Sequence, residues 1–225
     1  GTSSISGSVV SAAQSLTIGQ RAGQSDFSGY MTDLRIVKGT AVYTSAFTPP
    51  TERLTAVTNT SLLTCHLPYI ADGSTNAHSI TVNGNTKPEP FAPYEYLEYD
   101  STTNGGSMYF DGNDKLLLPP TSLNLGSNDF CIEAWVYTTA TSQQAIAGSL
   151  VWSNGTGSWL LTVNHNSNKI RFFVRHGGAT ILDATFEAGT FPIYQWVHVA
   201  VTRDGANLRA FINGTQAGTT NTVLG

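Results

Sequence analysis

Short runs of β-branched and aromatic residues recur along this chain between Gly, Asn and Asp residues that favour turns, and helical periodicity is almost absent. In the clearest stretch, residues 196–215, WVHVAVTR and NLRAFIN flank an Asp-Gly pair at 204–205, and an Asn-Gly pair follows at 213–214. Both pairs tolerate the positive φ angles of tight turns. The stretch is therefore predicted to form a hairpin followed by a second turn, with the three valines of WVHVAV on one face.

Other segments extend the same pattern. Residues 159–164, 170–175 and 179–186 are separated by polar turn sequences and predict a meander of three antiparallel strands. Residues 129–137 (DFCIEAWVY) alternate in two sets that both contain apolar members, which is typical of a central strand. Residues 83–106 carry three prolines and are interpreted as a long surface connection. About a dozen strands without βαβ spacing indicate an all-β sandwich of two antiparallel sheets.

The composition argues against several kinds of partner. The net charge is −4 and no run of Lys or Arg is present, so nucleic-acid binding is not expected. No apolar stretch approaches the roughly 20 residues of a membrane-spanning helix, so membrane insertion is not expected either. The chain begins at Gly1 without a signal-peptide profile and is interpreted as an excerpt of a longer protein.

Two cysteines, Cys65 and Cys131, lie in apolar strand-like runs and outside any CxxC pair. The sequence predicts two buried thiols, with a single disulfide as the alternative.

Several motifs are typical of a known family. The stretch from residue 108 to 214 contains MYFDGNDKLLL, FCIEAWVY, WVHVAVTRDG and LRAFINGT, and it resembles the first two thirds of a laminin-G-like domain of the concanavalin-A-like lectin and glucanase superfamily. Residues 16–64, with LTIGQ, GYMTDLRI and LTAVTNTSLLTC, resemble the closing third of that domain as it occurs in tandem in phage and cyanophage structural proteins. The resemblance implies a jelly-roll sandwich whose pieces stand here in circularly permuted order.

The rotated order predicts one domain over residues 1–225, in which residues 1–60 supply the closing strands and residues 61–225 the opening strands. A β fragment of roughly 60 residues without disulfides or metal buries too little apolar surface to fold alone. Residues 1–60 are therefore expected either to fold back onto their own chain as a circular permutant or to complete a neighbouring copy by strand swapping.

The sequence lacks the usual catalytic constellations. The resemblance implies that a glucanase would carry carboxylates at alternate positions of one strand, and Glu133 is the only carboxylate in its predicted strand. No GxSxG, HExxH or phosphate-binding Gly-rich loop is present. The five histidines show no metal-ligand spacing and are interpreted as strand or turn residues: His66, His78, His165, His176 and His198. The chain is predicted not to be an enzyme and to require no cofactor.

A structural calcium ion is implied by the resemblance, because related sandwiches often carry one. The oxygen ligands that such an ion needs are available at Asp33, Asp111, Asn113 and Asp114. The alternative is a plain turn in which the Asp111 carboxylate bonds nearby backbone amides.

Sugar binding requires a flat aromatic ring that stacks on a pyranose and a few polar groups that bind its hydroxyls. Two tryptophans bracket the turn at residues 153–158, and two basic residues at a later turn are expected at the same rim. The candidate carbohydrate-binding residues are Trp152, Trp159, Asn154, Arg175 and His176. For the two tryptophans the alternative is packing at a sheet end. Trp135 and Trp196 fall inside strands and are predicted to be core residues.

Together with the resemblance, these observations predict a non-catalytic carbohydrate-binding or adhesion module of a larger phage structural protein at a virion or extracellular surface. Its expected partners are a glycan or cell-surface polysaccharide and neighbouring copies of itself. Two alternatives are a purely architectural module that assembles with its own copies and a degenerate glycoside hydrolase.

Overall fold

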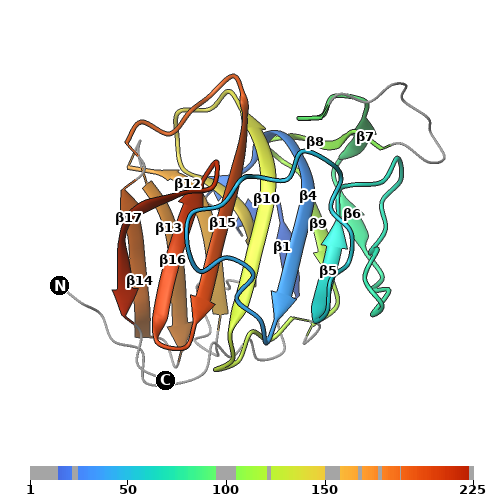
Figure 1. Cartoon of the computed structure of the whole chain (residues 1–225). Coiled ribbons are helices and arrows are strands. Elements are labelled where there is room, and N and C mark those ends of the chain that lie inside the picture. The colour runs from blue at the N-terminus through green and yellow to red at the C-terminus, as the bar shows by residue number, and fades with distance from the viewer. Residues whose placement is uncertain are drawn as a thin grey trace.

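The computed structural model describes residues 15–21, 25–94, 105–120, 123–149, 158–166, 169–176, 179–187 and 189–222. In these residues it confirms an all-β fold, without helices, in which two antiparallel sheets pack face to face as a sandwich (Figure 1). The described part of the chain accordingly contains no helix that is long and apolar enough to cross a membrane.

The seven-stranded sheet consists, in spatial order, of β14 (Ala179–Glu187), β13 (Lys169–His176), β12 (Ser158–His165), β11 (Gln144–Gly148), β1 (Leu16–Ile18), β9 (Lys115–Leu118) and β6 (Thr81–Asn83). The eight-stranded sheet runs β17 (Thr215–Thr222), β16 (Asn207–Ile212), β15 (Trp196–Asp204), β10 (Phe130–Thr138), β4 (Ser28–Lys38), β8 (Ser107–Asp111) and β7 (Lys87–Glu89), and β5 (Thr60–Thr64) also pairs with β4. A small separate sheet joins β2 (Gln20–Arg21) to β3 (Ser25–Asp26).

The predicted local elements are confirmed. β12, β13 and β14 form the expected meander, and β10 is a central strand between β15 and β4. β15, β16 and β17 are joined by two tight turns, in which Gly205 has a φ of 56° and Asn213 a φ of 47°. Such positive φ angles favour Gly and Asn, which explains these residues at the two turns.

The amino-terminal third of the chain contributes inner strands to both sheets. β1 lies between β11 and β9, and β4 lies between β10 and β8 of the same chain. Neither sheet is continuous without these strands. The permuted order relative to the family, and any exchange of strands between copies, stay predictions, because both chain ends lie outside the described residues.

The predicted surface connection at residues 83–106 is partly wrong. Its first residue ends β6, and residues 87–89 form β7, which pairs with β8 at the edge of the eight-stranded sheet. Pro88 is tolerated there because an edge strand does not need a donor on its outer side. Residues 95–104 of this segment lie outside the described residues.

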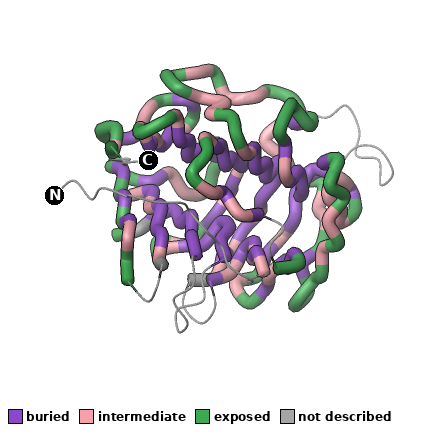
Figure 2. The backbone as a smooth tube through the Cα atoms, turned by 90° about the horizontal axis from the view of Figure 1, so that it is seen from below, coloured by how far each residue is buried: buried purple, intermediate pink, exposed green. Residues whose placement is uncertain are grey.

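The core fills the space between the two sheets, as the buried strand segments in Figure 2 show. Val197, Val199 and Val201 all belong to it, as their alternation predicted. The prediction of two buried thiols is confirmed, because Cys65 and Cys131 are both buried and free.

A β-bulge in β4 interrupts the regular pairing with β10. Thr32 lies opposite Trp135 and Arg35 opposite Glu133, so that Asp33 and Leu34 together face a single residue. Asp33 has a φ of 53°, which is uncommon outside Gly, Asn and Asp. The bulge lies at the point where the neighbour of β4 changes from β8 to β5.

Residues 39–59, here called the strap, connect β4 to β5 and cross the outer face of the eight-stranded sheet (Figure 1). The Phe47 amide donates to the Gly214 carbonyl oxygen at 2.9 Å, and the Thr202 hydroxyl donates to the Tyr43 carbonyl oxygen at 2.7 Å. The strap therefore covers part of a face that would otherwise be open to solvent.

Candidate functional site

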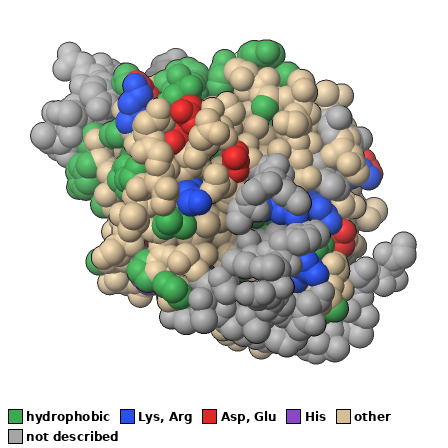
Figure 3. Space-filling view, turned by 180° about the vertical axis from the view of Figure 1, so that it is seen from behind, with side chains coloured by type: hydrophobic (Ala, Val, Ile, Leu, Met, Phe, Trp, Pro, Cys, Tyr) green, Lys and Arg blue, Asp and Glu red, His purple; other side chains and the backbone are tan. Residues whose placement is uncertain are grey.

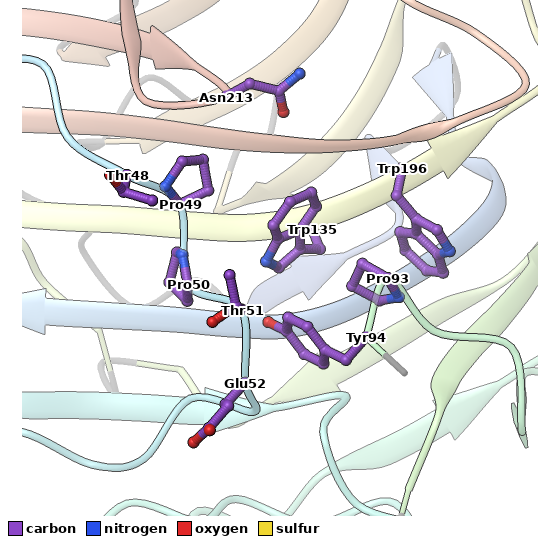
Figure 4. Close-up of a pocket in the computed structure, with 10 residues that line it drawn as sticks. All are labelled: Thr48, Pro49, Pro50, Thr51, Glu52, Pro93, Tyr94, Trp135, Trp196 and Asn213. Atoms are coloured by element: carbon purple, nitrogen blue, oxygen red, sulfur yellow. The ribbon is translucent and has the colours of Figure 1, made fainter. Parts of the chain in front are cut away.

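A hollow of about 720 Å³ lies on the outer face of the eight-stranded sheet (Figure 4). The strap forms one wall, the segment after β7 forms the opposite wall, and side chains of β10 and β15 form the floor between them. The lining residues are Thr48, Pro49, Pro50, Thr51, Glu52, Pro93, Tyr94, Trp135, Trp196 and Asn213.

Aromatic rings form the floor and one wall of this hollow. The rings of Tyr94 and Trp135 lie edge to face, with centroids 6.1 Å apart. Trp196 packs against Phe91, whose side chain is 41% exposed, at 5.1 Å between ring centroids. Figure 4 shows the Trp135 indole nitrogen directed toward Thr51 and Tyr94, and this nitrogen is buried and has no hydrogen-bond partner among the described residues. What the hollow offers to a ligand is therefore its apolar ring faces.

Asp33 lies behind the hollow and binds the strap. Its Oδ1 accepts a hydrogen bond from the Leu54 amide of the strap at 2.9 Å. Burial raises the pKa of Asp33 to about 6, although the Leu54 amide and the nearby Tyr94 side chain lower it again in part. The prediction that Asp33 is a calcium ligand stays a prediction; in the structure its carboxyl group holds the strap.

Glu133 forms a buried polar cluster under the strap. Its Oε1 accepts hydrogen bonds from Nε and Nη2 of Arg35 at 2.9 and 2.6 Å. Its Oε2 accepts one from the Tyr43 hydroxyl at 2.7 Å and lies 3.1 Å from Nε2 of His198. Burial alone would raise the pKa of Glu133, but His198, Arg35 and Tyr43 lower it below its ordinary value. Both carboxylate oxygens are therefore occupied, and the side chain is fully buried.

The predicted sugar site is not assembled as expected. Trp159 is wrong as a surface residue, because its side chain is 0% exposed and stacks on Phe172 inside the sandwich. Trp152, Asn154 and the side chain of His176 lie outside the described residues. Arg175 is half-buried on β13 of the seven-stranded sheet, on the opposite side of the molecule from the hollow.

The prediction that Trp135 and Trp196 are core residues is also wrong. Both are only half-buried, and both line the hollow. They lie on the outer face because their neighbours in each strand, Val136 and Val197, take the inner positions.

The proposed calcium ligands divide into two separate places. Asp111 lies opposite Ser28, five positions along β4 from Asp33, which corresponds to roughly 17 Å along a strand. In the turn after β8, Asp111 accepts a hydrogen bond from the Asn113 amide at 2.9 Å, and Asp114 accepts one from the Asn85 amide at 2.7 Å. These contacts match the alternative of a plain turn. The described residues contain no group of three or more His, Cys, Asp or Glu that could hold a metal ion.

The sandwich with its aromatic hollow defines a lectin-like binding module. A family model described as the concanavalin A-like lectin/glucanases superfamily, of the laminin G type, matches residues 100–225, which is more than half of the chain. The chain therefore belongs to this superfamily. Comparison of the chain with curated proteins and with solved structures yields no match.

Proposed function

We propose that this chain is a non-catalytic carbohydrate-binding module of a larger phage structural protein, exposed at a virion or extracellular surface, and that the hollow is its glycan site. One observation carries the proposal: Trp135, Trp196 and Tyr94 converge in a single open hollow with Thr51 and Asn213 beside them. Ring faces of this kind stack on the apolar side of a pyranose, and hydroxyl and amide groups bind its hydroxyls.

The acidic residues of the site support binding rather than hydrolysis. Glycoside hydrolysis needs two carboxyl groups that flank the scissile bond, one of which donates a proton. Among the described residues, Glu52 is the only carboxyl group that lines the hollow. Glu133 lies two residues before Trp135 on the same face of β10, but it is fully buried. Both of its carboxylate oxygens are bonded, to Arg35, Tyr43 and His198, so it is not presented to a ligand.

A glycan array, followed by titration calorimetry on the sugars that bind, tests the proposal. Trp135→Ala and Trp196→Ala are expected to weaken binding by roughly tenfold or more, because each removes an aromatic face worth about 1.5 kcal/mol or more. Tyr69→Ala is the matched control, since Tyr69 is 52% exposed and does not line the hollow.

Three outcomes separate the alternatives. Saturable binding that is lost in the two tryptophan variants and kept in Tyr69→Ala supports the proposal. No binding across a broad panel, with a multiple of the chain mass in light scattering, favours the architectural module that assembles with its own copies. Release of reducing sugar from a bound oligosaccharide would favour the degenerate hydrolase.

A further inference from the structure

Four neighbouring strands of the eight-stranded sheet carry aromatic residues at matching positions. Tyr109 of β8 pairs with Tyr30 of β4, and Tyr137 of β10 pairs with Tyr30 on one side and with Trp196 of β15 on the other. Successive rings of this set, here called the aromatic row, lie 5.1, 6.0 and 5.8 Å apart between centroids. The row lies on the outer face of the sheet, because a strand neighbour of each member belongs to the core between the sheets.

Phe91, from the segment after β7, packs on the middle of the aromatic row. Its ring centroid lies 4.9 Å from those of Tyr30 and Tyr137 and 5.1 Å from that of Trp196. Three rings thus fix the position of Phe91, although Phe91 remains 41% exposed. An exposed apolar ring whose position is fixed is pre-organised for a ligand, because little conformational freedom is lost when the ligand stacks on it.

Phe91 lies just outside the hollow and is connected to it through Trp196. Trp196 belongs to the aromatic row and also lines the hollow, and Pro93 and Tyr94, which follow Phe91 closely in the chain, form one of its walls. From Trp196 to Phe91 the ring centroids are 5.1 Å apart, and the rings are inclined by 35°. A pyranose ring and its linking oxygen extend a linear polysaccharide by a similar length. Stacking positions for two consecutive sugars are therefore present on this face.

The charges around these rings favour an uncharged ligand. Of the described residues that line the hollow, Glu52 alone is charged. At the other end of the aromatic row, Lys87 lies opposite Tyr109 and is paired with Glu89 at 2.7 Å, so this end is locally neutral. The rear of the molecule, by contrast, carries charged side chains of both signs (Figure 3). A neutral saccharide therefore fits the rings better than an acidic one.

We propose that Phe91 is a second stacking position next to the hollow, so that the ligand is a neutral chain of at least two sugars rather than a single sugar. The inference rests on the proposed function, because Trp196 is shared by the hollow and the aromatic row. One sugar stacks on the rings of the hollow and the next one on the exposed face of Phe91. Phe91 thereby makes the affinity depend on the length of the ligand.

Titration calorimetry with cello-, malto- and chito-oligosaccharides of one to six sugars tests this proposal, because all three series are neutral and linear. In at least one series the affinity is expected to rise by roughly tenfold or more from the monosaccharide to the longer members. In Phe91→Ala this gain should be lost, while the affinity for the monosaccharide stays that of the unsubstituted protein. Tyr69→Ala is the control, because Tyr69 is a 52% exposed aromatic residue that belongs neither to the hollow nor to the aromatic row.

Two further variants separate stacking on Phe91 from its contacts with the aromatic row. Phe91→Leu keeps an apolar side chain on the row but removes the flat ring, so it should bind the longer sugars as weakly as Phe91→Ala does. Phe91→Tyr keeps the flat ring and should bind them as the unsubstituted protein does. Full affinity of Phe91→Leu for the longer sugars would overturn the proposal, because Phe91 would then act only by holding its segment on the sheet.

The outcomes separate this proposal from the proposed function. A length dependence that is lost in Phe91→Ala and Phe91→Leu but kept in Tyr69→Ala supports it. Equal affinity for one and six sugars, or a length dependence that survives in Phe91→Ala, overturns it and leaves the glycan hollow in place. Absence of binding by all three series also overturns it, and the glycan array then shows whether the proposed function fails as well.

Discussion

The buried carboxyl group of Asp33 predicts an unusual dependence of stability on pH. The pKa of Asp33 is about 6 in the folded chain and 3.8 in the reference state, because burial disfavours its ionised form. An acid whose pKa is raised by folding binds its proton more tightly in the native state. Its ionisation therefore lowers the free energy of unfolding as the pH rises from about 4 to about 6.

The size of this effect follows from the shift in pKa. One pKa unit corresponds to about 1.4 kcal/mol, so a shift of about two units gives about 3 kcal/mol of lost stability once Asp33 is fully ionised. Asparagine is uncharged and similar in shape to the protonated acid, and its Oδ1 can still accept the hydrogen bond from the Leu54 amide. Asp33→Asn is therefore expected to raise the free energy of unfolding by up to about 3 kcal/mol near pH 7 and to leave it nearly unchanged near pH 4.

Urea unfolding, followed by tryptophan fluorescence at a series of pH values from about 4 to about 7.5, measures this difference. Asp111→Asn makes the same substitution at an exposed turn and shows the effect of removing one charge alone. A gain for Asp33→Asn that has the same size at every pH would refute the reasoning, because the gain would then not arise from ionisation. A loss of stability near pH 7 would refute it as well.

Two further predictions concern buried residues. Burial and the charge of Arg53 lower the pKa of His66 to about 4, so His66 contributes stability above pH 6.5 that is lost as the pH falls toward 4. In His66→Gln this contribution is absent, so the opposite effect of Asp33 should be seen: the free energy of unfolding should fall by about 3 kcal/mol as the pH rises through this range. A free energy of unfolding that does not change with pH in this variant would contradict the prediction. Trp159→Ala should destabilise the fold by about 3 to 5 kcal/mol in urea unfolding, because it leaves a cavity between the sheets. The sugar affinity of the folded molecules should stay unchanged. A loss of affinity without a loss of stability would instead indicate that Trp159 is a surface residue that contacts the sugar.

Most of the fold could be predicted from the sequence, because its signals are local. The Asp-Gly and Asn-Gly turns and the alternation of valines in β15 specify hairpins whatever the rest of the chain does. The neighbours of β4 are different, because its partners β10 and β8 lie far along the chain, and only the resemblance indicated that the first third of the sequence closes the sheets.

The site was missed because each tryptophan was assessed by itself. The sequence contained a usable signal: if the valines of β15 face the core, Trp196 and His198 must face the other way, and the same reasoning places Trp135 beside Glu133 on the outer side of β10. What no local pattern shows is the course of the strap. If the course of the strap is not known, nothing indicates that the outer face of β10 and β15 is partly covered and hollowed. Large aromatic residues in central strands are then most simply assigned to the core.

The strap explains why one sheet face carries both the hollow and the two most unusual carboxyl groups. A strap without its own secondary structure must be held by contacts to the sheet, and it is held at separate points by Glu133 through Tyr43, by Asp33 through Leu54, and by the turn at Gly214 through Phe47. At Gly214 a Cβ atom would lie 1.7 Å from the Phe47 carbonyl oxygen, so this turn accepts the strap only without a side chain. Burying a carboxylate costs folding free energy unless it is hydrogen-bonded. Glu133 and Asp33 each accept a hydrogen bond from the strap, which offsets part of this cost. The cost of burying Asp33 is therefore best understood as the cost of fixing the strap, and with it one wall of the hollow, on the sheet.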